Sequence, residues 1–151
     1  MGNSAHVTES DNLMIRTAAL DIDSSGNFSV VNITEQVREF VSSSGLAHGQ
    51  VLVFYKHTTG AVLIAEHEAG IIADLQDVLE RISPVDYAYI HHLKGVDFNG
   101  HAHVRSALLT VSVTIPILNG DMLLGQYQEI LVIDDQTDPA PRQVIVQVIG
   151  A

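Results

Sequence analysis

The sequence of 151 residues contains no cysteine and no tryptophan, and basic side chains are scarce. The absence of cysteine excludes a disulfide framework, a thiolate zinc finger and a cysteine nucleophile. Lysine and arginine together number 7 against 18 aspartates and glutamates, which gives a formal net charge of -11. Because nucleic acids and anionic lipid surfaces are bound by clustered basic side chains, we expect neither nucleic acid nor a membrane as a partner.

The sequence also has no apolar run long enough to cross a bilayer. A spanning helix needs about 20 apolar residues, whereas the longest apolar stretch, residues 108–118, is interrupted by Thr110, Ser112, Thr114 and Pro116. Residues 1–12 are polar and contain no apolar segment of the signal-peptide kind. We therefore expect a flexible N-terminal tail over residues 1–12, followed by one soluble, cytoplasmic domain over residues 13–151.

Short apolar segments predict a protein made mostly of β-strands. The expected strands cover residues 13–20, 28–33, 50–55, 61–65, 108–118, 121–133 and 143–149. Asn119-Gly120 predicts a tight hairpin between two of these strands. Apolar residues at helical spacing predict two helices, one from Thr34 to just before Gly45 and one over residues 70–81. The pattern indicates an α+β fold, a single compact domain of mostly antiparallel sheet with two main helices.

One expected strand is apolar on both of its faces. The segment Ile130-Leu131-Val132-Ile133 contains no polar residue. Strands of this kind occur where both faces of a sheet are covered. In a domain of this size we expect the second face to be covered by helices and by contacts between subunits.

Histidine is abundant, and six of the eight histidines lie between His57 and His103. In the segment His101-Ala102-His103, an extended backbone would aim both imidazoles at one metal ion, whereas a helix would leave only one of them able to bind. Of the neighbours His91 and His92, at most one can join the same site if the backbone is extended. Three imidazoles and an open position would make a catalytic rather than a structural zinc site. Exposed loop histidines without a ligand are the alternative.

Candidates for binding phosphate are fewer, because the sequence has no glycine-rich phosphate loop. The cations near the histidines are Lys56, Lys94 and Arg105, and the nearby hydroxyl donors are Thr58, Thr59 and Ser106. Arg105 could hold an anion through charge-assisted hydrogen bonds, or it could form a surface salt bridge. In so acidic a protein, a bound diphosphate would depend on a metal ion to offset repulsion.

Together these motifs resemble the YjbQ-like family, which is named for a secondary thiamine-phosphate synthase activity. The resemblance covers residues 49–150 and rests on His57-Thr58-Thr59, Glu66, Asp74, Tyr89-x-His91, Asn99, Ala102-His103, Ser106, Thr114-Ile115-Pro116, Asn119-Gly120, Leu124-Gly125 and Gln128. It implies an α+β domain of antiparallel sheet that assembles as a homotrimer, with its site near subunit boundaries. Three features depart from the family pattern: Tyr127 stands where tryptophan is usual, the basic segment before the last strand is reduced to Pro141-Arg142, and Arg105 stands where lysine is frequent.

The resemblance further implies which residues carry function. His57, His91 and His103 would bind a divalent metal, zinc or magnesium, and His101 would be the substitute if the His-x-His segment is extended. We expect Glu66 to act as the catalytic base or as a metal partner. The contacts to a small phosphorylated or anionic ligand would be Thr58, Thr59, Arg105, Ser106 and Gln128. The implied reaction joins hydroxymethylpyrimidine diphosphate to thiazole phosphate and releases pyrophosphate. A metal-dependent hydrolase and a non-enzymatic trimer that binds metal or anion are the alternatives.

Overall fold

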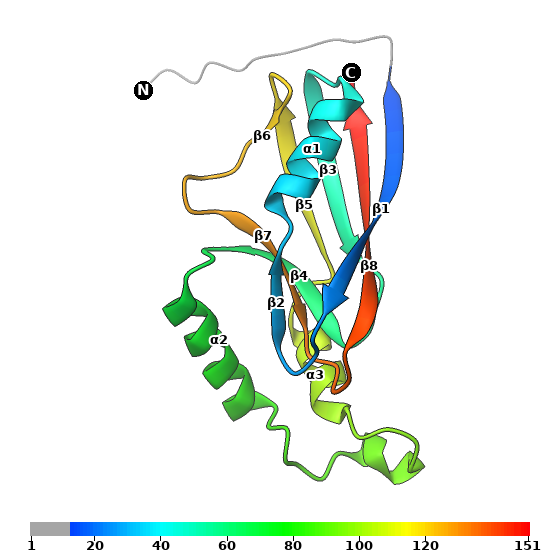
Figure 1. Ribbon diagram of the computed structural model, residues 1–151, viewed down its shortest axis with the longest axis vertical. Helices are drawn as coiled ribbons and strands as arrows, with labels where there is room; N and C mark the ends of the chain where they lie inside the picture. Colours follow the sequence, from blue (N-terminus) through cyan, green and yellow to red (C-terminus); the bar gives the residue numbers. More distant parts are fainter. Residues whose placement is uncertain (1–12) are drawn as a thin grey trace.

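The computed structural model describes residues 13–151, so the expected tail over residues 1–12 lies outside the described residues. Two antiparallel sheets form the domain, one with the strand order β1-β8-β3-β5-β6 and the other with the order β2-β7-β4 (Figure 1). The strands are β1 Met14–Ser24, β2 Ser29–Asn32, β3 His48–Tyr55, β4 Gly60–Ala65, β5 Ser112–Leu118, β6 Asp121–Met122, β7 Glu129–Asp134 and β8 Ala140–Gly150. The helices are α1 Thr34–Ser44, α2 Ala69–Ile82 and α3 Gly100–Leu108, with a 3-10 helix η1 at Ile90–Lys94. The expected α+β class is confirmed, and α3 is added to the two predicted helices.

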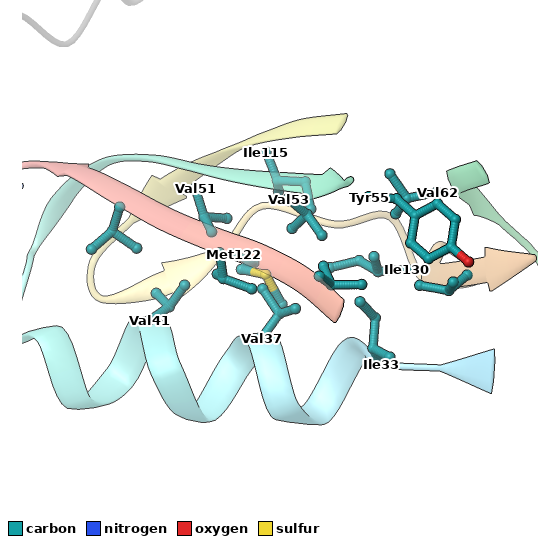
Figure 2. Close-up of a cluster of buried hydrophobic side chains, with 14 of the residues drawn as sticks. Ile33, Val37, Val41, Val51, Val53, Tyr55, Val62, Ile115, Met122 and Ile130 are labelled. Carbon is teal, nitrogen blue, oxygen red and sulfur yellow. The ribbon is translucent and has the colours of Figure 1, made fainter. Parts of the chain in front are cut away.

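The main hydrophobic core lies between α1, the five-stranded sheet and the inner face of the three-stranded sheet. Val37 and Val41 are four residues apart, so they lie on one face of α1, and both are fully buried. Figure 2 shows these two side chains pointing from the helix toward Met122 and the strand residues Val51 and Val53. The apolar stripe read from the sequence therefore packs α1 onto the sheet.

The second helix covers the outer face of the three-stranded sheet. Val132 of β7 belongs to the main core, whereas Ile133 packs in a second cluster with Leu79 of α2 and Phe28. Ile72 and Leu75 of α2 also pack against this cluster. A helix of the same chain thus covers the second apolar face of β7, and this strand needs no subunit contact for its burial.

Two expected strands are shorter than their apolar patterns indicated. The range 108–118 begins with the end of α3, and β5 starts only at Ser112. The range 121–133 was expected as one strand, but β6 and β7 belong to different sheets and are joined by residues 123–128. Both strands bury apolar side chains in the same core, so the pattern alone did not reveal the break. The hairpin at Asn119-Gly120 forms as predicted, with both residues at the positive φ that this turn requires.

The chain between α2 and α3 extends away from the two sheets at the end opposite the C-terminus (Figure 1). We call residues 83–99 the arm. It carries η1 and leads directly into α3. None of the helices in residues 13–151 is both long and apolar enough to cross a membrane.

Candidate metal centre

Three potential metal ligands meet where the arm joins α3. One ligand atom each from His91, Asp97 and His103 lies within 4.8 Å of the other two. His91 Nε2 is 2.9 Å from Asp97 Oδ1, but it is buried and forms no hydrogen bond to any residue in the described part of the chain. At this distance a protonated His91 would form an ion pair with Asp97, and a metal ion could take the place of that proton. Such an arrangement suits ligand atoms that share a metal ion.

The local backbone explains how these residues converge. His91 lies in η1, and Gly95 ends this helix with a left-handed φ of 65° while its N–H donates to the His92 carbonyl. Glycine adopts this conformation without steric cost. The chain then turns back, so that Asp97 lies beside His91 before α3 begins.

Close packing holds η1 against the first turn of α3. The Gly100 N–H donates to His92 Nε2 at 3.1 Å. A Cβ atom at Gly100 would lie 2.6 Å from Cγ of Tyr89, so a larger residue would push the two segments apart. Tyr89 is itself anchored, because its hydroxyl donates to the Pro84 carbonyl at 2.7 Å. These contacts place the His91 and His103 rings with their centroids 4.8 Å apart.

The helical form of α3 decides which histidine of the His101-Ala102-His103 segment joins this group. His103 Nδ1 lies 3.0 Å from the Thr58 carbonyl oxygen, which can only accept a proton, so Nδ1 donates and Nε2 remains free as a ligand atom. His101 points elsewhere and is buried, and its pKa is lowered by that burial and by the nearby charge of Arg105. The histidines diverge as expected for a helix, and the substitute role of His101 is not supported by its position.

His57, the third implied ligand, lies outside this group. Its Nε2 accepts a hydrogen bond from the Gln143 N–H at 3.0 Å. Burial lowers the pKa of His57, and the charges of Arg142 and Lys56 lower it further. The structure thus brings together His91 and His103 and adds Asp97, which was not among the ligands expected from the sequence. Asp97 stands midway between the two histidines in the sequence, and this position is the one feature of the sequence that could have indicated it as a third ligand.

Arg105 has a different role from the expected anion contact. Its side chain is 2% exposed and forms ion pairs with Asp135 at 3.0 Å and Glu80 at 2.5 Å. Its Nε donates to the Ser83 carbonyl. With all three nitrogens engaged inside the protein, Arg105 ties α3 to the end of α2 and to the residue that follows β7. It is neither a surface salt bridge nor an exposed anion site.

Two of the three expected hydroxyl donors, Thr59 and Ser106, are buried within the fold. Ser106 is buried, and its hydroxyl donates to the Gly60 carbonyl at 2.7 Å. Thr59 is buried as well, and its carbonyl accepts from the Asp135 N–H. Thr58 is exposed and contributes its carbonyl to His103. Of these three residues, only Thr58 has an exposed side chain next to the candidate ligands His91, Asp97 and His103, which we call the metal group.

Glu66 and Gln128 lie at the far end of the three-stranded sheet. Thr58 precedes β4 and Glu66 follows it, and a strand of 6 residues spans about 20 Å. Ala65 pairs with Glu129 in the antiparallel ladder, so Gln128 is at the same end as Glu66. Both are exposed, and the Gln128 amide oxygen accepts from the Gly125 N–H. Within one chain, the implied site residues therefore form two separate groups.

Comparison with known proteins assigns the chain to a family. The sequence model described as "UPF0047 protein YjbQ-like" matches residues 18–151. A UPF0047 protein of Methanothermobacter thermautotrophicus is 35% identical over 136 residues, which cover 90% of this chain and 93% of the relative. A UPF0047 protein of Mycobacterium tuberculosis is 36% identical over 128 residues, covering 85% of this chain and 93% of the relative.

Solved structures agree with this assignment. The crystal structure of a YbjQ-like protein from Sulfolobus solfataricus matches with a TM-score of 0.88 at 26% identity, covering 93% of this chain and 100% of the other. A YjbQ/UPF0047 family protein from Clostridium acetobutylicum matches with a TM-score of 0.79 at 29% identity, covering 87% of this chain and 98% of the other. The strand arrangement, the sequence similarity and the extent of the match together show that this chain belongs to the YjbQ-like UPF0047 family.

Proposed function

We propose that this protein is a metal-dependent enzyme acting on small phosphorylated molecules, with the thiamine-phosphate synthase reaction that the family resemblance implies. The observation that carries this proposal is the meeting of His91, Asp97 and His103 in one chain. Two imidazoles and one carboxylate form the ligand set of many catalytic zinc sites, in which further positions remain open for substrate. Imidazole ligands favour zinc over magnesium, because magnesium prefers oxygen ligands.

The protein's own residues would prepare this site for an anionic substrate. A bound zinc ion would supply positive charge near the departing diphosphate. Thr58 would hold His103 in the tautomer that offers Nε2, and the Gly100 contacts to Tyr89 and His92 would keep His91 beside it. In a protein with a formal charge of -11, a diphosphate without a metal ion would be repelled.

The exposed surface of the arm supports assembly into the homotrimer that the resemblance implies. Ile90, Leu93 and Val96 are each more than four-fifths exposed, and Phe98 is 65% exposed. Apolar surface gathered in this way marks an interaction site. We therefore propose that neighbouring copies cover the arm. Since the arm carries two of the three metal ligands, the centre would lie at the subunit boundary.

Such an assembly would also reconcile the two separate groups of implied site residues. Glu66 and Gln128 cannot reach the metal group of their own chain, because the length of β4 lies between them. A neighbouring copy could place its own Glu66 and Gln128 against the arm. Glu66 would then act as a base or metal partner across the boundary, as the family resemblance implies.

Replacing Leu93 by aspartate is expected to dissociate the trimer into monomers, because each copy would then bury a charge in the contact. Analytical ultracentrifugation would measure the change, and Leu118→Asp, an exposed apolar position on β5, is the matched control. The Leu93→Asp monomer should still bind zinc, since all three ligands lie in one chain, but it should lose turnover. A monomeric wild-type protein, or a trimeric Leu93→Asp variant, would contradict the proposed assembly.

Turnover is tested with zinc-loaded protein, hydroxymethylpyrimidine diphosphate and thiazole phosphate. Thiamine phosphate should form, should disappear after chelation and should return when zinc is restored. Bound zinc without product, together with hydrolysis of phenyl phosphate, would favour the metal-dependent hydrolase. Bound zinc with neither activity would favour a metal- or anion-binding protein and would refute the proposed enzyme.

A further inference from the structure

A hollow of about 300 Å³ lies at the end of the molecule that carries the metal group. Its lining residues come from three segments that the five-stranded sheet brings together: Asp21, Lys56, His57, Pro141, Arg142 and Gln143. Asp21 near the end of β1 pairs with Gln143 near the start of β8, and Lys56 directly follows β3, the other neighbour of β8. The hollow is thus built on regular strands.

Arg142 has hydrogen-bonding capacity that the fold does not use. Its Nε donates to Asp134 Oδ2 at 2.7 Å, and the two side chains are 12% and 2% exposed. Its Nη2 is buried and has no hydrogen-bond partner among residues 13–151. A guanidinium group carries five N–H donors, and a buried charged donor without an acceptor is costly. Arg142 can therefore take a further acceptor besides Asp134.

Lys56 adds a second positive charge to the same hollow. Its Nζ donates to the Gln143 side-chain oxygen at 3.2 Å, and it forms no ion pair within the described part of the chain. The acidic groups here are Asp134, which is paired with Arg142, and Asp21, which accepts from the Gln143 amide at 3.1 Å. Among the lining residues and the ion-pair partner of Arg142, two cations stand against two carboxylates, in a protein of formal charge -11. An anion is repelled less there than at most of the surface.

The hollow lies next to the metal group along the backbone. His57 lines the hollow, and the adjacent Thr58 offers its carbonyl oxygen to His103. Arg105 and Ser106, the expected anion contacts, are engaged inside the fold. A substrate that reaches from the metal group to the hollow would have one group at the metal and an anionic group near Arg142.

We propose that this hollow is the phosphate-binding subsite of the protein, with the Arg142 guanidinium and Lys56 Nζ as the donors to the phosphoryl oxygens. Guanidinium and ammonium groups bind phosphate through charge-assisted hydrogen bonds, which are stronger than neutral ones. The assignment of this phosphate to a substrate rests on the proposed function. The binding of an anion in the hollow does not depend on the proposed function, because neither Arg142 nor Lys56 is a proposed metal ligand.

The test is a titration of the chelator-treated full-length protein with inorganic phosphate at constant ionic strength. Nuclear magnetic resonance would follow the backbone amides of Lys56 and Gln143 and the Arg142 Nε–H signal. Wild type and His103→Ala should bind with the same affinity. Lys56→Gln and Arg142→Lys should each bind at least tenfold more weakly, whereas Arg81→Gln, at an exposed position on α2, should bind as wild type. Arg142→Lys keeps a positive partner for Asp134, which protects the fold.

Three results would overturn the subsite: no response of these signals to phosphate, unchanged affinity in both Lys56→Gln and Arg142→Lys, or an equal response to acetate. Loss of binding in His103→Ala alone would place the anion at the metal group and would also overturn it. Phosphate binding that persists in a protein without turnover would refute the proposed enzyme while leaving the subsite intact. The two proposals can therefore fail separately.

Discussion

Replacing His103 by alanine is expected to reduce zinc affinity by at least about 100-fold, because mutations of groups that merely orient a ligand already cost about 10–100-fold. The wild-type protein should hold one zinc ion per chain, and His91→Ala should lose it as His103→Ala does. Both histidines are only partly buried, so the variants should remain folded. Elemental analysis of protein purified without added metal, with circular dichroism as the check on folding, measures this result.

The ligand set can be resolved by two further variants. Asp97→Asn removes the carboxylate charge and should weaken zinc binding, whereas His57→Ala should leave the zinc content unchanged, because His57 Nε2 already accepts the Gln143 N–H. His67→Ala, at an exposed position outside the group, is the control. Zinc loss in His57→Ala with none in Asp97→Asn would restore the ligand set implied by the family resemblance. Equal zinc content in every variant would remove the proposed centre.

Arg105→Ala is expected to lower the free energy of unfolding by about 3–5 kcal/mol, the usual cost of removing one partner from a buried ion pair. The variant would leave Asp135 buried without its positive neighbour, since that side chain is only 4% exposed. Urea denaturation at a fixed protein concentration measures the change. Arg81→Ala removes an exposed arginine that is paired with Asp77 on α2 and should change stability little. A stable Arg105→Ala protein with weakened phosphate binding would instead support the anion contact expected from the sequence.

The effect of Arg105→Ala should also depend on pH. Burial raises the pKa of Asp135, while Arg105 lowers it in part, and Asp134 and Glu80 raise it further. A carboxyl group whose pKa is raised by folding binds its proton more tightly in the folded state, so its contribution to stability falls as the pH rises through its ordinary and then its raised pKa. Without Arg105 the pKa of Asp135 rises further, so the variant loses more stability than the wild type as the pH rises. The stability difference between wild type and variant should therefore be larger at neutral pH than at about pH 4.

Local patterns predicted most of the elements because they are imposed by short-range chemistry. Asn119-Gly120 produced its hairpin, since positive φ angles at both positions select that turn. The range expected for the second helix, 70–81, differs by one residue at each end from Ala69–Ile82, and Ser83-Pro84 follows it. The pattern failed where β6 passes into β7, because an apolar run does not tell which of two sheets a segment joins.

The grouping of the candidate metal ligands was predicted only in part. The spacing of His91 and His103 marked them as ligands through the family resemblance, and they do meet. Asp97 was missed because its contribution depends on the turn at Gly95, which brings it back to His91. Arg105 was read as an anion contact because a sequence shows its charge but not its neighbours. The carboxylates of Asp135 and Glu80 reach it from segments more than twenty positions away.

The sequence by itself determined the fold class and the family, and it limited which side chains could form a metal or anion site. Without cysteine, histidine and carboxylate are the remaining strong metal ligands, and with so few cations an anionic substrate needs a compensating charge. Only the tertiary structure decided that Asp97 rather than His57 joins the two histidines, and that Glu66 lies a strand's length away. The physical reason is that composition and spacing act locally, whereas a binding site depends on distances between atoms that only chain packing sets.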